Sequence, residues 1–180
     1  MRTNIVFTLT GTDRIGLVEE ITKLLLDLDG NVETSRMARL GGEFAILMLV
    51  SIPADQLANL DRDVEYLITQ GYKVTTSQTE QTYAEAHPGW RSYQIDVQGA
   101  DHEGIIHQVA RHLSQRGINI ESMETGTAPA PISGTPLFTM TALGAVPPNL
   151  PGQDWEAALA EVGRHLNVDI MVSAAFKETK

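Results

Sequence analysis

Apolar and polar residues follow two different periods along the first 80 residues. Residues 4–10 alternate, with Ile5, Phe7 and Leu9 on one face, which predicts a half-buried strand. Residues 14–28 repeat their apolar positions at helical spacing, which predicts a helix with one buried face. The same reasoning predicts strands at 31–39, 43–52 and 72–79, a hairpin turn at Gly41-Gly42 and a second helix at 54–70.

The second half of the chain repeats this order. We predict strands at 91–98, 118–127, 137–145 and 168–175, with helices at 102–115 and 154–165. This is the split βαβ, or ferredoxin-like, order, in which two helices cover one face of a four-stranded sheet. The sequence therefore predicts an α+β protein of two ferredoxin-like βαββαβ domains in tandem, 1–80 and 91–180, with a linker at 81–90.

The two halves differ at the hairpin between their second and third strands. In place of the Gly41-Gly42 turn, the second half has residues 128–136, with prolines at 129, 131 and 136. Because this stretch is too long for an ordinary two-residue hairpin turn, we expect an extended loop there.

A short phrase recurs where the first strand of each half meets the first helix. Gly11-Thr12-Asp13-Arg14-Ile15-Gly16 returns 88 residues later as Gly99-Ala100-Asp101-His102-Glu103-Gly104, which indicates a duplicated unit. We predict that the first glycine adopts a positive φ, that the aspartate caps the helix and that the second glycine lets a ligand approach. The N–H groups at a helix start suit a carboxylate or phosphate. A plain helix cap needs no ligand to explain the aspartate, so both interpretations stay open.

An asparagine opens the second strand of each half, at Asn31 and Asn119. Its amide offers donors and an acceptor, which suits the carboxylate and ammonium groups of an amino acid. If two units pair edge to edge, we expect this point to lie near the first strand–helix loop of the neighbouring unit. An asparagine that bonds to its own backbone at a turn is the alternative.

Charge and composition narrow the classes of function. The net charge of −10 and the 13 scattered lysines and arginines argue against direct binding to nucleic acid. The start has no signal-peptide pattern, no apolar run is long enough to span a membrane, and cysteine is absent. We therefore expect a cytoplasmic protein without a membrane partner.

The sequence indicates neither an enzyme nor a cofactor or metal site. The run from His102 to His107 superficially resembles the helix of a zinc protease. Its histidines are five residues apart, however, so they diverge by about 140° around a helix. Glycine-rich phosphate loops and serine nucleophile elbows are also missing.

The repeated βαββαβ order, the two Gly-x-Asp-x-x-Gly phrases and the Asn-Val-Glu and Asn-Ile-Glu sequences resemble tandem ACT domains. Within that family the chain is similar to regulators of the glycine cleavage system transcriptional repressor type, over about residues 3–80 and 91–176. The resemblance implies an allosteric regulator that binds a small amino acid, such as glycine, at an interface between two ACT units. It also implies a homo-oligomer and a protein partner such as a transcription factor.

The resemblance further implies which residues bind the ligand. They are Gly11, Thr12, Asp13, Arg14, Ile15 and Gly16 with Asn31, and Gly99, Asp101, His102 and Gly104 with Asn119. The proline-rich insertion puts the second site in question, since it implies that this site is altered or closed. The alternative is an interaction or dimerisation module with no ligand, whose repeated loops are only helix caps.

Overall fold

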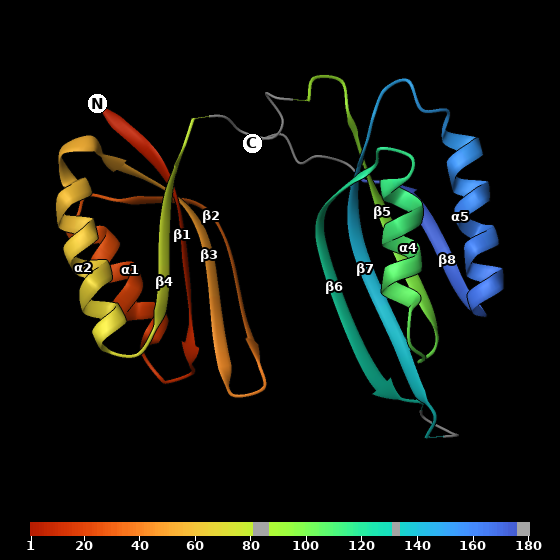
Figure 1. The fold of residues 1–180 in the computed structure, drawn as a ribbon, viewed down its shortest axis with the longest axis horizontal. Helices are drawn as coiled ribbons and strands as arrows, with labels where there is room; N and C mark the ends of the chain where they lie inside the picture. The colour runs from red at the N-terminus through yellow and green to blue at the C-terminus, as the bar shows by residue number, and fades with distance from the viewer. Residues whose placement is uncertain (81–86, 131–133, 176–180) are drawn as a thin grey trace. The chain divides into compact units, whose positions relative to one another are not determined.

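The chain forms two compact units, Met1–Tyr83 and Ala84–Lys180. The computed structural model describes residues 1–80, 87–130 and 134–175, so part of the predicted linker (81–86) and part of the proline-rich stretch (131–133) lie outside the described residues. Each unit contains a four-stranded antiparallel sheet with two helices on one face (Figure 1). The predicted fold class, two ferredoxin-like α+β domains, is confirmed.

The first unit has the strand order β2-β3-β1-β4. Its elements are β1 (Arg2–Thr12), α1 (Leu17–Asp27), β2 (Asn31–Leu40), β3 (Glu43–Pro53), the 3-10 turn η1 (Ala54–Gln56), α2 (Leu57–Thr69) and β4 (Lys73–Thr79). Ile5, Phe7 and Leu9 are buried on the face of β1 that the helices cover, as the alternation predicts. Burial of such side chains is the main favourable contribution to folding.

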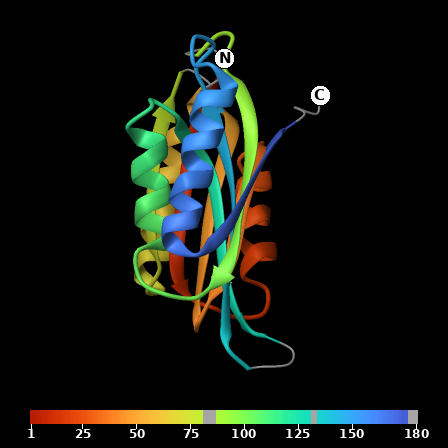
Figure 2. The same cartoon turned by 90° about the vertical axis from the view of Figure 1, so that its right-hand side faces the viewer.

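The second unit has the equivalent order β6-β7-β5-β8. Its elements are β5 (Arg91–Ala100), α4 (Ile105–Ser114), β6 (Asn119–Pro129), β7 (Pro136–Val146), α5 (Gly152–Leu166) and β8 (Val168–Ala174). Figure 2 shows α4 and α5 side by side over this sheet. Ile95 and Val97 of β5, together with Val109, Trp155 and Leu159 of the helices, form a buried core.

The first helix of each unit begins three residues later than predicted. Helix α1 begins at Leu17 rather than Arg14, and α4 begins at Ile105 rather than His102. The preceding residues, Gly16 and Gly104, have φ values of 87° and 92°. A residue in this left-handed region cannot continue a right-handed helix, so the glycine sets where the helix begins.

The hairpins differ between the units less than predicted. Leu40 pairs with Glu43 across the Gly41-Gly42 turn, which confirms that turn. In the second unit β6 and β7 continue into the proline-rich stretch and end at the pair Pro129–Pro136, so the connection is shorter than the 128–136 loop we expected. Proline at the end of a strand removes no essential ladder hydrogen bond.

The buried His112 gives the second unit a pH dependence that we expect to be measurable. Burial, and secondly the charge of Arg116, lower the pKa of His112 from its ordinary value of 6.5. The unfolded chain therefore takes up the proton first, and the contribution of neutral His112 to the stability of the second unit is lost as the pH decreases from about 6.5 through the lowered pKa.

The first repeat offers the matched substitution, because Leu24 is the residue 88 positions before His112. We expect the His112→Leu variant to lose less stability than the wild type between pH 7.5 and pH 5. Urea unfolding of the second unit at both pH values measures the difference. An equal loss in the two proteins would contradict the assignment.

Candidate functional site

The repeated phrase forms the connection between the first strand and the first helix of each unit. Gly16 and Gly104 are the residues from which α1 and α4 start, and neither helix has a side-chain cap. Among the described residues, the backbone N–H groups of Ile15, Gly16 and Val18 have no intramolecular acceptor. These exposed donors lie at the positive end of the helix dipole, which favours an anion there.

The prediction that Asp13 and Asp101 cap these helices is wrong. Instead, the N–H of Asp13 donates to the Gly42 carbonyl at 3.0 Å, and the N–H of Asp101 donates to the Pro136 carbonyl at 3.0 Å. The carboxylate of Asp13 also lies 3.8 Å from the guanidinium of Arg39. Each aspartate thus joins the loop to the neighbouring hairpin through its backbone N–H. Its side chain does not cap the helix, because the helix begins only after Gly16 or Gly104.

The positive φ predicted for the first glycine of the phrase is also wrong, and it belongs to the second glycine instead. Gly11 and Gly99 do not have positive φ and lie inside β1 and β5. A Cβ atom at Gly11 would approach the ring of Tyr72 to 2.5 Å, and one at Gly99 would approach Val168 Cγ1 to 2.6 Å. The first glycine therefore provides clearance for the last strand of its sheet, and the second provides the positive φ.

A substitution at Gly16 tests whether the positive φ is what requires glycine at this position. The position is open, because a Cβ atom at Gly16 would have nothing within 4 Å, so steric contact is not the constraint. We expect Gly16→Ala to lower the free energy of unfolding of the first unit by about 1–2 kcal/mol, because an L-residue is strained in this conformation. Gly16→Asn should cost less, since asparagine tolerates left-handed φ. Denaturant unfolding measures both, and equal losses would contradict the conformational explanation.

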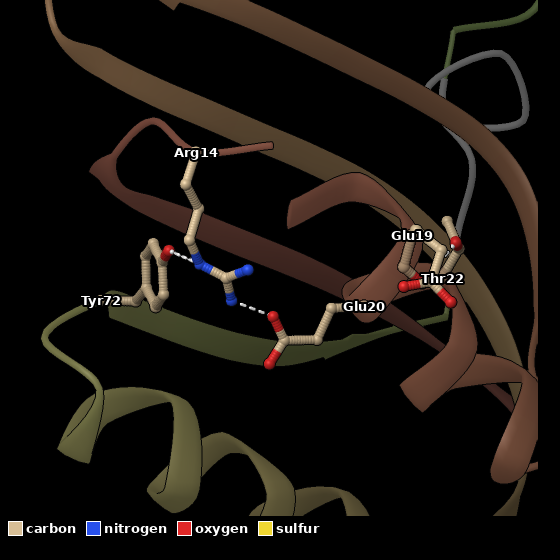
Figure 3. Close-up of polar contacts among 5 residues, drawn as sticks. All are labelled: Arg14, Glu19, Glu20, Thr22 and Tyr72. Atoms are coloured by element: carbon tan, nitrogen blue, oxygen red, sulfur yellow. Dashed lines mark hydrogen bonds and ion pairs between the residues drawn. The ribbon is translucent and has the colours of Figure 1, made fainter. Parts of the chain in front are cut away.

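Arg14 and His102 occupy equivalent places in the two loops but make different contacts. Arg14 donates from Nε to the Tyr72 hydroxyl at 2.9 Å and from Nη2 to the Glu20 carboxylate (Figure 3). These hydrogen bonds, first to Glu20 and then to Tyr72, raise the pKa of Arg14, which is therefore cationic. His102 bonds through Nε2 to the Leu166 carbonyl at 2.8 Å, which is the main reason that its pKa is raised.

The remaining positions of the first loop are solvent-exposed. Thr12 ends β1, and Ile15 is fully exposed although it is apolar. In the second loop Ala100, Glu103 and Gly104 are exposed as well. These exposed residues of the two phrases are accessible to a ligand or partner.

The structure places Asn31 and Asn119 where predicted along the chain, as the first residues of β2 and β6. Asn31 pairs with Ser51 of β3, whereas Thr12 pairs with Glu43, eight residues along the same strand. Eight residues of strand span about 26 Å, so one unit does not bring its own asparagine to its own loop. A site that uses both therefore needs two copies of this fold.

Asn31 has a contact that we did not predict from the sequence. Its Nδ2 donates to Glu33 Oε1 at 2.8 Å. Glu33 lies at a shift in the β2–β3 register, and Glu121 lies at the same shift in the second sheet. The recurrence of Glu two residues after Asn could have indicated this shared bulge. The contacts of Arg14 with Tyr72, 58 residues away, carry no such signal.

The described part of the chain contains no helix with the length and hydropathy of a membrane span. Within the same residues, no three side chains of histidine, cysteine, aspartate or glutamate come together as metal ligands.

Comparison with known proteins agrees with the fold. A family model described as the ACT domain matches residues 3–74. The crystal structure of an unknown protein from Galdieria sulphuraria is 34% identical, with 98% of this chain and all of that chain covered and a TM-score of 0.86. A candidate glycine cleavage system transcriptional repressor shares the fold at 22% identity and a TM-score of 0.66, with 96% and 97% of the chains covered. No curated protein matches the sequence. The chain belongs to the ACT-domain family, with one ferredoxin-like fold in each unit.

Proposed function

We propose that this protein is a regulatory amino-acid sensor that binds a small amino acid at the loop Gly11–Gly16 and acts through a protein partner. Membership of the ACT family supports a regulatory, ligand-sensing role rather than a catalytic one. The single observation that carries the proposal is the set of open N–H donors at Ile15, Gly16 and Val18, beside the cation of Arg14. Both features favour a carboxylate.

The ammonium group of the ligand needs an acceptor on the opposite side of the site. We propose that Asn31, at the start of β2, supplies it from a neighbouring ACT fold. The distance of about 26 Å between Asn31 and the loop of its own unit supports this division. Self-association of the chain is then part of binding, and the bound amino acid shifts the contacts available to the partner protein.

Thermal unfolding with each standard amino acid tests this proposal. A ligand that binds only the folded state and is present at 100 times its Kd stabilises by about 2.7 kcal/mol, which raises the unfolding temperature by several degrees. We expect such a rise for a small amino acid, glycine included. A flat response to all of them would favour the interaction module without a ligand.

Asn31→Ala should weaken binding about tenfold in calorimetry, because a hydrogen bond to a charged group is lost. The matched control is Asn149→Ala, which alters an exposed asparagine of the second unit. Unchanged affinity in Asn31→Ala would remove this residue from the site.

A further inference from the structure

Arg14 is held in one place by a rigid neighbour. Tyr72, the residue directly before β4, is buried, with 7% of its surface exposed, and its ring lies against Gly11. Its hydroxyl accepts the Nε–H of Arg14, and the guanidinium carbon lies 5.9 Å from the ring centroid. A fixed ring with a hydrogen-bonded hydroxyl restricts the guanidinium to the start of α1.

The other side of the guanidinium is occupied by a carboxylate of the same loop region. Glu20, in the first turn of α1, pairs with Arg14 Nη2, and its N–H donates to the Gly16 carbonyl at 2.9 Å. The neighbouring Glu19 makes no such pair and points away from Arg14 (Figure 3). The Arg14–Glu20 pair is partly exposed, so it is weak enough to exchange.

We propose that Glu20 is a built-in competitor for Arg14, which the carboxylate of the amino-acid ligand replaces, and that Tyr72 is the residue that positions Arg14 for this exchange. The proposal rests on the function proposed above and adds how the ligand is recognised. The side of α1 that carries Glu20 is open to solvent, so the displaced carboxylate can be hydrated there. Glu20 lines a surface hollow of about 320 Å³ between α1 and α2, in which the ammonium of Lys23 is already paired with Asp27.

The second unit has replaced each member of this arrangement. His102 stands in place of Arg14, and its ring is bonded to the Leu166 and Glu103 carbonyls. Val168 lies against Gly99 where Tyr72 lies against Gly11, and Gln108 stands 88 residues after Glu20. Exchange of carboxylates on a guanidinium is therefore a property of the first loop, and one tight site per chain follows.

Calorimetry on the full-length protein tests the exchange. The probes are glycine, L-serine, L-leucine and L-phenylalanine, each measured beside its carboxamide, which keeps the ammonium and lacks the negative charge.

Glu20→Gln should bind the amino acid about two- to fivefold more tightly, the gain that corresponds to losing a partly exposed ion pair. Arg14→Gln should bind it about tenfold more weakly, because a charge-assisted hydrogen bond is lost. Tyr72→Phe, which keeps the ring, should also weaken it, without weakening the carboxamide.

The matched control is Asp27→Asn, which also removes one carboxylate of α1 from an exposed ion pair, with Lys23. It should bind as the wild type does, and the wild type should bind one molecule per chain. If the wild type binds an amino acid but Glu20→Gln does not gain affinity, or Arg14→Gln does not lose it, the competitor proposal is wrong and the proposed function stands. If neither the wild type nor Glu20→Gln binds any probe, the proposed function fails and this proposal fails with it.

Discussion

Replacing Trp155 by alanine should lower the free energy of unfolding of the second unit by about 3–5 kcal/mol. Only 1% of this side chain is exposed, and its ring meets the edge of Tyr93 at a centroid distance of 5.4 Å. The substitution leaves a large cavity among the residues that α4, α5 and the sheet share. A domain of this size has about 5–15 kcal/mol in total, so much of its stability depends on this residue.

Denaturant unfolding followed by circular dichroism measures the loss, and the transition of the first unit should not move. Trp155→Phe is the control, because it refills most of the space. The indole Nε1 has no hydrogen-bond partner in the described structure, so removing it breaks no bond. A loss below about 1 kcal/mol in Trp155→Ala would contradict the buried position of the ring.

Gly99→Ala should lower the free energy of unfolding of the second unit by about 1–3 kcal/mol. A Cβ atom there would lie 2.6 Å from Val168 Cγ1 and 2.9 Å from Val168 Cα. Because the second of these atoms belongs to the backbone, β8 itself must move away from β5. The loss is therefore one of strand packing and not of turn conformation.

Gly126 of β6 is the matched control in the same sheet. A Cβ atom at Gly126 would meet only Thr139 Oγ1, at an ordinary 3.5 Å, and its φ is not positive. Gly126→Ala should therefore leave stability unchanged or raise it by up to about 1 kcal/mol, since alanine is less flexible in the unfolded chain. If Gly99→Ala is no more harmful than Gly126→Ala in parallel urea titrations, the clearance role is wrong.

The sequence could predict the elements because their periods are clear and occur twice. The alternation of Ile5, Phe7 and Leu9 marks β1, and the repeated phrase locates the strand–helix loop of both units. Asn31 and Asn119 lie within one residue of the predicted strand starts, because local turn residues set where the preceding helix ends. The duplication strengthened these predictions, because the same element order was expected in both halves of the chain.

The errors concern contacts between residues that are far apart in the sequence and meet only in the folded sheet. Whether Gly11 supplies a turn or clearance depends on Tyr72, which the fold brings against it from 61 residues away. Asp13 has the residue type and position of a cap, yet Gly16 starts the helix and leaves its side chain free to face Arg39. Residue preference alone does not decide between such alternatives.

The proposed function depends above all on the first strand–helix loop receiving the carboxylate of an amino acid. A ¹⁵N–¹H NMR titration of the full-length protein, with the amino acid that stabilises it most, observes that loop residue by residue. We expect saturable shifts of the amide signals of Ile15, Gly16 and Val18, which are diminished in Arg14→Gln. Saturable shifts confined to other parts of the chain, with these three amides unchanged, would contradict the proposed site.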